Sequence, residues 1–137
     1  MRNAFRTLLL VCLFSTSACS LTDPTSTPEN VELVLSGSSG GQVRLVTSQV
    51  FTLGGGGEGD SGTVVELIAA DTSIVSSRHQ AIFPLAPSYI FYAQTLPLSP
   101  DVAPQELQMS VFVDGQTRYS KSGSLGLDDF EYAYVYR

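Results

Sequence analysis

Short apolar runs with a two-residue period, separated by turns rich in glycine and proline, constrain the fold of this chain more than any other feature. Such runs predict β-strands with one buried face, and no segment shows the 3.6-residue period of an amphipathic helix. The pattern predicts an all-β chain: a single antiparallel, immunoglobulin-like β-sandwich of about seven strands, with a small barrel as the alternative. The strand candidates are residues 31–35, 43–47, 63–70, 74–75, 89–95, 106–113, 116–120 and 130–136.

Turn signals predict how neighbouring strands connect. We expect residues 31–35 and 43–47 to pair as a hairpin across a loose loop at 36–41. Residues 71–73 read Asp-Thr-Ser and are expected to form a turn, and Pro84 and Pro87 bracket another. Asp114 and Gly115 form the dipeptide that most strongly favours a two-residue hairpin turn.

The first nineteen residues have the organisation of an export signal. Arg2 and Arg6 precede an apolar run at 8–14, small residues follow at 15–18, and Cys19 comes next. The run is shorter than the roughly 20 apolar residues that span a bilayer, but it suits a cleaved signal. This order resembles the lipobox of bacterial lipoproteins. The resemblance implies cleavage before Cys19, lipidation of that cysteine, and anchoring in the cell envelope, at the outer membrane of a double-membraned host.

On this interpretation residues 1–18 are the signal peptide, 19–30 are a Ser/Thr/Pro-rich tether, and 31–137 are the β-sandwich domain. The tether has too few apolar residues to pack and is expected to be extended or disordered. The alternative is an ordinary secretory signal cut after Ala18, which would leave the protein secreted or periplasmic. Thr16 keeps this alternative open, because lipoproteins more often carry Leu at that position.

The number of cysteines and the net charge limit the disulfides and the classes of binding partner that we expect. The chain has 2 Cys, of which Cys12 lies in the signal, so the folded domain is expected to hold no disulfide. Cleavage removes two of the 7 basic residues and none of the 13 acidic ones. Such an acidic surface repels phosphate backbones, so no nucleic-acid partner is expected. It also disfavours contact with anionic lipid, which leaves the acyl anchor at Cys19 as the expected contact with the membrane.

Two sequence motifs resemble catalytic or phosphate-binding elements and are rejected. Residues 59–62 spell Gly-Asp-Ser-Gly, as around the nucleophile of chymotrypsin-like proteases, but that mechanism needs a histidine base oriented by a carboxylate. The chain's one histidine, His79, follows the serine, which reverses that family's order. The glycine tract at 54–57 lacks the lysine of a phosphate-binding loop. Both motifs are expected to belong to a flexible loop.

Metal and acid–base candidates are equally sparse. His79 has no second histidine or available cysteine as a ligand partner, and Asp128, Asp129 and Glu131 do not follow the spacing of a calcium loop. We therefore expect no catalytic residue, metal or cofactor. The alternative is a glycan-acting hydrolase that uses acidic residues such as Glu66 and Asp71, since two carboxylates in one cleft can perform glycoside hydrolysis.

An aromatic stripe near the C-terminus is the best candidate for recognition. Phe130, Tyr132, Tyr134 and Tyr136 share one face of a predicted strand. One interpretation, which we favour, is that this strand is architectural and the tyrosines cap the core with their hydroxyls in water. The other is that Tyr132, Tyr134 and Tyr136 form a platform for a sugar ring or a protein partner.

Several short stretches resemble MmpS-type domains, small β-sandwiches known best as mycobacterial accessory proteins of lipid-exporting transporters. The stretches are Phe-Pro-Leu at 83–85, Tyr-Ile-Phe-Tyr-Ala-Gln at 89–94, Met-Ser-Val-Phe-Val-Asp-Gly-Gln at 109–116 and Val-Leu-Ser-Gly at 34–37. The chain lacks that family's tryptophan after the proline, and it has a lipid anchor signal in place of a transmembrane helix. The resemblance implies a β-sandwich and, secondarily, a role as an accessory to an envelope transporter. The signal, the tether, the strand pattern and the lack of a catalytic set predict a non-catalytic, lipid-anchored binding or accessory module, with an envelope protein or a glycan as the expected partner.

Overall fold

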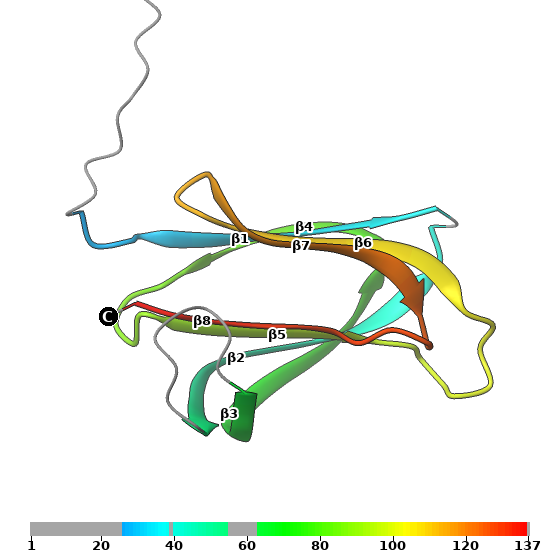
Figure 1. Cartoon of the computed structure of the whole chain (residues 1–137), viewed down its shortest axis with the longest axis horizontal. Coiled ribbons are helices and arrows are strands. Elements are labelled where there is room, and N and C mark those ends of the chain that lie inside the picture. The colour runs from blue at the N-terminus through cyan, green and yellow to red at the C-terminus, as the bar shows by residue number, and fades with distance from the viewer. Residues whose placement is uncertain (1–25, 39, 55–62, 137) are drawn as a thin grey trace, which may run out of the picture.

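The computed structural model describes residues 26–38, 40–54 and 63–136; the export signal, Cys19, most of the tether and the Gly-Asp-Ser-Gly motif lie outside these ranges. Its strands form two four-stranded sheets, one in the order β4-β1-β6-β7 and the other β3-β2-β5-β8, and all neighbouring strands are antiparallel (Figure 1). The predicted all-β antiparallel sandwich is confirmed, with eight strands described. The strands are β1 (Asn30–Gly37), β2 (Gln42–Gly54), β3 (Thr63–Ser76), β4 (Arg78–Pro84), β5 (Ile90–Leu96), β6 (Gln105–Val113), β7 (Gln116–Leu125) and β8 (Phe130–Val135).

The main core lies between the two sheets. Alternate residues of β1 point into it, so that Val31, Leu33 and Leu35 are almost completely buried, as their two-residue period predicts. The opposite sheet closes the core from below with the fully buried ring of Phe91. The other buried members are Val43, Leu45, Leu85, Ala93, Leu107, Met109, Val111, Val113, Leu125, Phe130, Tyr132 and Tyr134.

The expected hairpin between residues 31–35 and 43–47 is wrong. Strand β1 pairs with β4 and β6, whereas β2 pairs with β3 and β5 in the other sheet. The intervening segment passes between the sheets and is held by backbone bonds: Gly37 donates to the Ser77 carbonyl (2.7 Å), and Ser77 donates to that of Gly41 (2.6 Å). A two-residue period shows which side chains of a strand share a face, but it does not show which other strand pairs with it.

The turn predicted at 71–73 is also wrong. Strand β3 runs through it without interruption, because Asp71 and Thr72 lie opposite Thr47 and Val46 of β2. The residues after Ser77 then form β4, a strand that the sequence did not reveal, since its first half is polar. His79 is half-buried in β4. Pairing with a neighbouring strand overrides local turn preference, because it satisfies the backbone hydrogen bonds.

The predicted turn at Asp114 and Gly115 is confirmed. Their φ angles of 47° and 77° fit the left-handed positions of a tight two-residue hairpin between β6 and β7. The Asp114 carboxylate also accepts the backbone N–H groups of Glu29 (3.1 Å) and Asn30 (3.0 Å). The turn therefore holds the start of β1, and Asn30, expected to end the tether, belongs to the sandwich.

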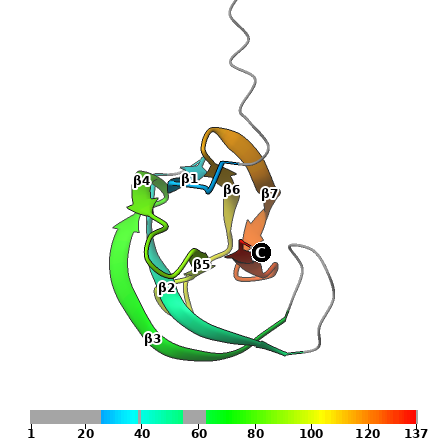
Figure 2. The ribbon, with the colours of Figure 1, turned by 90° about the vertical axis from the view of Figure 1, so that its left-hand side faces the viewer.

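The paired strands β2 and β3 bend so that one end of them covers the outer face of β5 and β8, which is the face turned away from the main core. Figure 2 shows β2 and β3 bending together through an arc that passes beneath β5. The distal part of the arc packs Phe51 against Tyr92, with 6.0 Å between ring centroids, in a second apolar cluster that also holds Ala133. Tyr92 and Ala133 point away from the main core, because their neighbours Phe91 and Tyr134 point into it. Strands β5 and β8 are thus covered on both faces.

Candidate functional site

The burial of the aromatic stripe agrees with the architectural interpretation that we favour and contradicts the alternative of a three-tyrosine platform. Tyr132 and Tyr134 are only 6% and 5% exposed and belong to the main core, whereas Tyr136 is 41% exposed. The Tyr132 ring stacks on Tyr119 of β7, with 5.0 Å between centroids. The sequence pattern identified the shared face of β8 but not its direction, and that face turns inward together with Phe130. Tyr132 and Tyr134 are therefore part of the core, and Tyr136 is the one tyrosine of the stripe that is exposed at the protein surface.

The carboxylates singled out in the sequence do not assemble into an acid–base pair. Glu66 and Asp71 lie on β3 opposite Thr52 and Thr47 respectively, and only Asp71 lines a cavity. The described part of the chain brings no three His, Cys, Asp or Glu side chains together as metal ligands. Nor does any described segment form a helix long and apolar enough to cross a membrane.

The acidic residues before and within β8 have structural contacts. The Asp128 Oδ2 atom accepts the backbone N–H of Ser124 at 2.8 Å, which fastens the turn between β7 and β8. The Glu131 carboxylate lies beside Tyr92 and accepts a hydrogen bond from its hydroxyl. Burial, with a further contribution from Glu131, raises the pKa of the Tyr92 phenol above its usual value.

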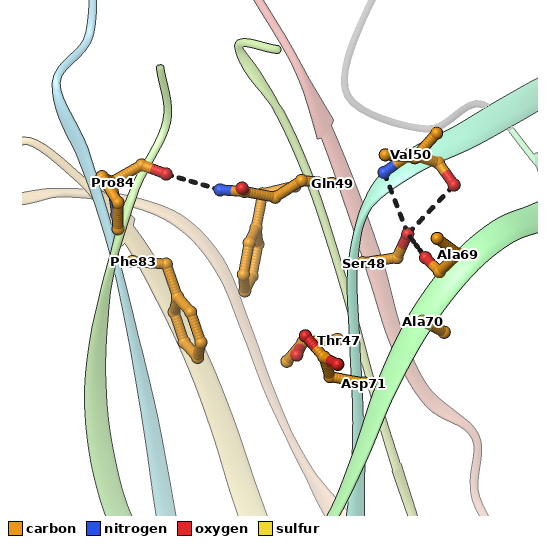
Figure 3. A pocket seen from close by; sticks show the side chains of 10 residues that line it. Thr47, Ser48, Gln49, Val50, Ala69, Ala70, Asp71, Phe83 and Pro84 are labelled. Atoms are coloured by element: carbon orange, nitrogen blue, oxygen red, sulfur yellow. Dashed lines mark hydrogen bonds between the residues drawn. The ribbon is translucent and has the colours of Figure 1, made fainter. Parts of the chain in front are cut away.

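A cavity of about 300 Å³ opens between the β2–β3 hairpin and the ends of β4 and β5. Figure 3 shows its two sides, with β2 and β3 facing Phe83 and Pro84 of β4. Its size is at the lower end of the range for small-molecule sites, roughly 300–1,000 Å³. It is lined by Thr47, Ser48, Gln49, Val50, Ala69, Ala70, Asp71, Phe83, Pro84 and Phe91.

A β-bulge in β2 shapes this cavity. The register with β3 shifts between Thr47 and Val50, as expected where one strand carries an extra residue. The buried Ser48 hydroxyl stabilises the bulge: it accepts the Val50 N–H at 3.0 Å and lies within hydrogen-bond distance of the Val50 and Ala69 carbonyls. Beyond the bulge, Gln49 extends toward β4 and donates from Nε2 to the Pro84 carbonyl (Figure 3). This amide bridges the two sheets at the rim of the cavity.

The lining combines aromatic rings with hydrogen-bond acceptors. Phe83 and Phe91 lie with their ring centroids 5.0 Å apart. Asp71 supplies the single charged side chain of the lining, next to its register partner Thr47. No described residue donates a hydrogen bond to the Asp71 carboxylate. The residues that line the cavity include no histidine, no cysteine and no second carboxylate.

Sequence reasoning reached only part of this site. It named Asp71, as half of a hydrolytic pair, and it missed Thr47, Gln49 and Phe83. The bulge that gathers them has no signal in a single sequence, because Ser, Gln and Val at 48–50 continue the apolar and polar pattern of β2 without a glycine.

A second, more open depression of about 520 Å³ lies at the other end of the sandwich, where β1 and β6 meet Arg78. The Arg78 guanidinium already donates to the carbonyls of Gly37 (2.9 Å) and Ser38 (3.0 Å). Arg78 therefore fastens the segment that leaves β1, and the less open cavity beside Asp71 is the stronger candidate for a ligand.

No family model, curated protein or solved structure matches this chain. The likeness to bacterial lipoproteins and to MmpS-type domains therefore stays a prediction from the sequence.

Proposed function

We propose that this protein is a lipid-anchored component of the cell envelope whose β-sandwich is a non-catalytic binding or accessory module, with the cavity beside Asp71 as its binding site. The observation that carries the proposal is the composition of that cavity. Aromatic walls and a few polar groups are typical of sites that hold a small molecule. Hydrolysis by two carboxylates would need a second acid near Asp71, and the lining has none.

The position of the cavity supports a role close to the membrane. Asn30, at the start of β1, lies opposite Pro84, which lines the cavity. An extended tether from Cys19 to Glu29 would span at most about 35–40 Å. An acylated Cys19 would therefore hold the cavity within that distance of the lipid surface. A ligand in the cavity would be an envelope component or a molecule passing through that space.

Fractionation tests the anchor. Cys19→Ala should release the protein from the membrane and from the detergent phase, because two or more acyl chains are what hold a lipoprotein stably. Cys12→Ala is the matched control, since it removes the same side chain within the signal and should leave the protein in the membrane fraction. Retention of the Cys19→Ala protein in the membrane would overturn the anchor. Release of both variants would assign the effect to export rather than to acylation.

A further inference from the structure

We infer that the cavity beside Asp71 binds a primary ammonium group carried on a short aliphatic or sugar body. This inference rests on the proposed binding role of that cavity and names the chemistry of its ligand. The first argument is charge. The lining has one carboxylate and no basic side chain. With no described group to neutralise it, Asp71 attracts a cation and repels phosphate or carboxylate ligands.

The acceptors at the cavity match the donors of an ammonium. A primary ammonium has three N–H donors and no acceptor. The Asp71 carboxylate and the Thr47 hydroxyl lie opposite each other on paired strands. Gln49 commits its Nε2 atom to the Pro84 carbonyl, which leaves its Oε1 atom as an acceptor. Calcium fits less well, since it takes six to eight oxygen ligands and this lining supplies a single carboxylate.

The walls suit the rest of such a ligand. Phe83 is half-buried and lines the cavity, so its ring can contact both a cation and an apolar carbon chain. Val50 and Ala69 add apolar surface on the opposite side. A cavity of about 300 Å³ restricts the ligand to a small molecule, such as a diamine or a single amino sugar.

The test titrates the full-length protein, isotope-labelled and purified in nonionic detergent, with three probes followed by NMR. Cadaverine presents the ammonium on an aliphatic chain, glucosamine presents it on a sugar, and N-acetylglucosamine keeps the sugar without the charge. We expect cadaverine, glucosamine or both to shift the amide signals of residues 47–50, 69–71 and 83, with an affinity that falls as salt rises from about 20 to 300 mM. N-acetylglucosamine should leave these signals unchanged.

Two variants make the test specific. Asp71→Asn should weaken binding of the amine at least about tenfold, because it removes a charge-assisted hydrogen bond. Glu66→Gln removes an exposed carboxylate from the same strand outside the cavity, and should change the affinity less than about twofold. The urea midpoint of each variant confirms that its fold is retained.

The results separate the ligand class from the wider proposal. Binding of cadaverine alone, or of glucosamine alone, supports the inference and identifies the body that the cavity accepts. Equal binding of N-acetylglucosamine and glucosamine, or an Asp71→Asn protein that binds normally, overturns the ammonium class while leaving a binding cavity. Absence of shifts with both amines overturns the inference as well. None of these results alters the Cys19 fractionation, which tests the anchor independently.

Discussion

Replacing Tyr132 with Ala should destabilise the domain far more than the same change at Tyr136. Both tyrosines belong to the same aromatic stripe, with Tyr132 inside β8 and Tyr136 directly after its last residue, so the comparison holds residue type constant. Tyr132 is 6% exposed and stacks on Tyr119, whereas Tyr136 is 41% exposed and has its nearest aromatic ring, that of Tyr89, 6.3 Å away. The difference in burial sets the difference in stability.

The magnitude follows from what each truncation removes. Deleting a buried aromatic ring costs about 3–5 kcal/mol of unfolding free energy, which includes the cavity left behind. A surface substitution usually stays within about 0.5 kcal/mol. With a urea m-value of roughly 2 kcal/mol/M, Tyr132→Ala should lower the unfolding midpoint by about 2 M, and Tyr136→Ala by about 0.3 M or less.

Urea denaturation followed by circular dichroism measures both midpoints. The m-values should be similar, since both variants expose nearly the same surface on unfolding. Equal and small shifts for the two variants would refute the core position of Tyr132 and restore the interpretation of the stripe as an exposed platform.

Three further predictions concern the segments that hold the sandwich together. Gly37→Ala should lower the unfolding free energy by about 1–3 kcal/mol, because the added Cβ would lie 2.5 Å from the Ser77 Cβ atom. Combining it with Ser77→Gly should recover part of the lost stability, and an equal loss in the double variant would contradict the clash. Asp114→Gly keeps the left-handed turn but removes the acceptor of the Glu29 amide, so we expect a loss of about 1–2 kcal/mol and faster hydrogen exchange at that amide, which unchanged exchange would disprove. Burial raises the pKa of the Tyr92 phenol, so the folded state keeps a proton that the unfolded state loses near pH 10. Stability present below about pH 10 should therefore fall as the pH rises further, and Tyr92→Phe should make this fall shallower in urea midpoints measured from pH 8 to 11; an unaltered pH profile would contradict the role of Tyr92.

The parts of the fold that the sequence predicted well are local. The alternation in β1 located its buried face, and the dipeptide at Asp114 located the β6–β7 turn, because each depends on residues adjacent in the chain. The strands predicted at 89–95 and 130–136 match β5 and β8 within one residue for the same reason, although both faces of each strand are covered.

The parts that the sequence did not predict depend on distant partners. The hairpin expected from β1 to β2 failed because strand pairing is decided across the whole chain, where β6 and β4 flank β1. Whether the tyrosine stripe faces the core or the solvent depends on where the opposite sheet lies, which the local sequence does not show. The cavity is formed by three segments that lie far apart in the sequence, namely the bulge at Thr47–Val50, the middle of β3 and the end of β4, so no local pattern predicts it. Only Asp71 was named in advance, and for a different chemistry.

The most direct test of the central claim, that Cys19 anchors this domain in the envelope, is the mass of the N-terminal tryptic peptide. No Lys or Arg lies between residues 7 and 43, so trypsin should release one fragment that ends at Arg44. The account predicts that this fragment begins at Cys19 and carries acyl chains on the cysteine sulfur and on the terminal amine. A fragment that begins at Cys19 with a free thiol, or one that begins at Thr7, would contradict it.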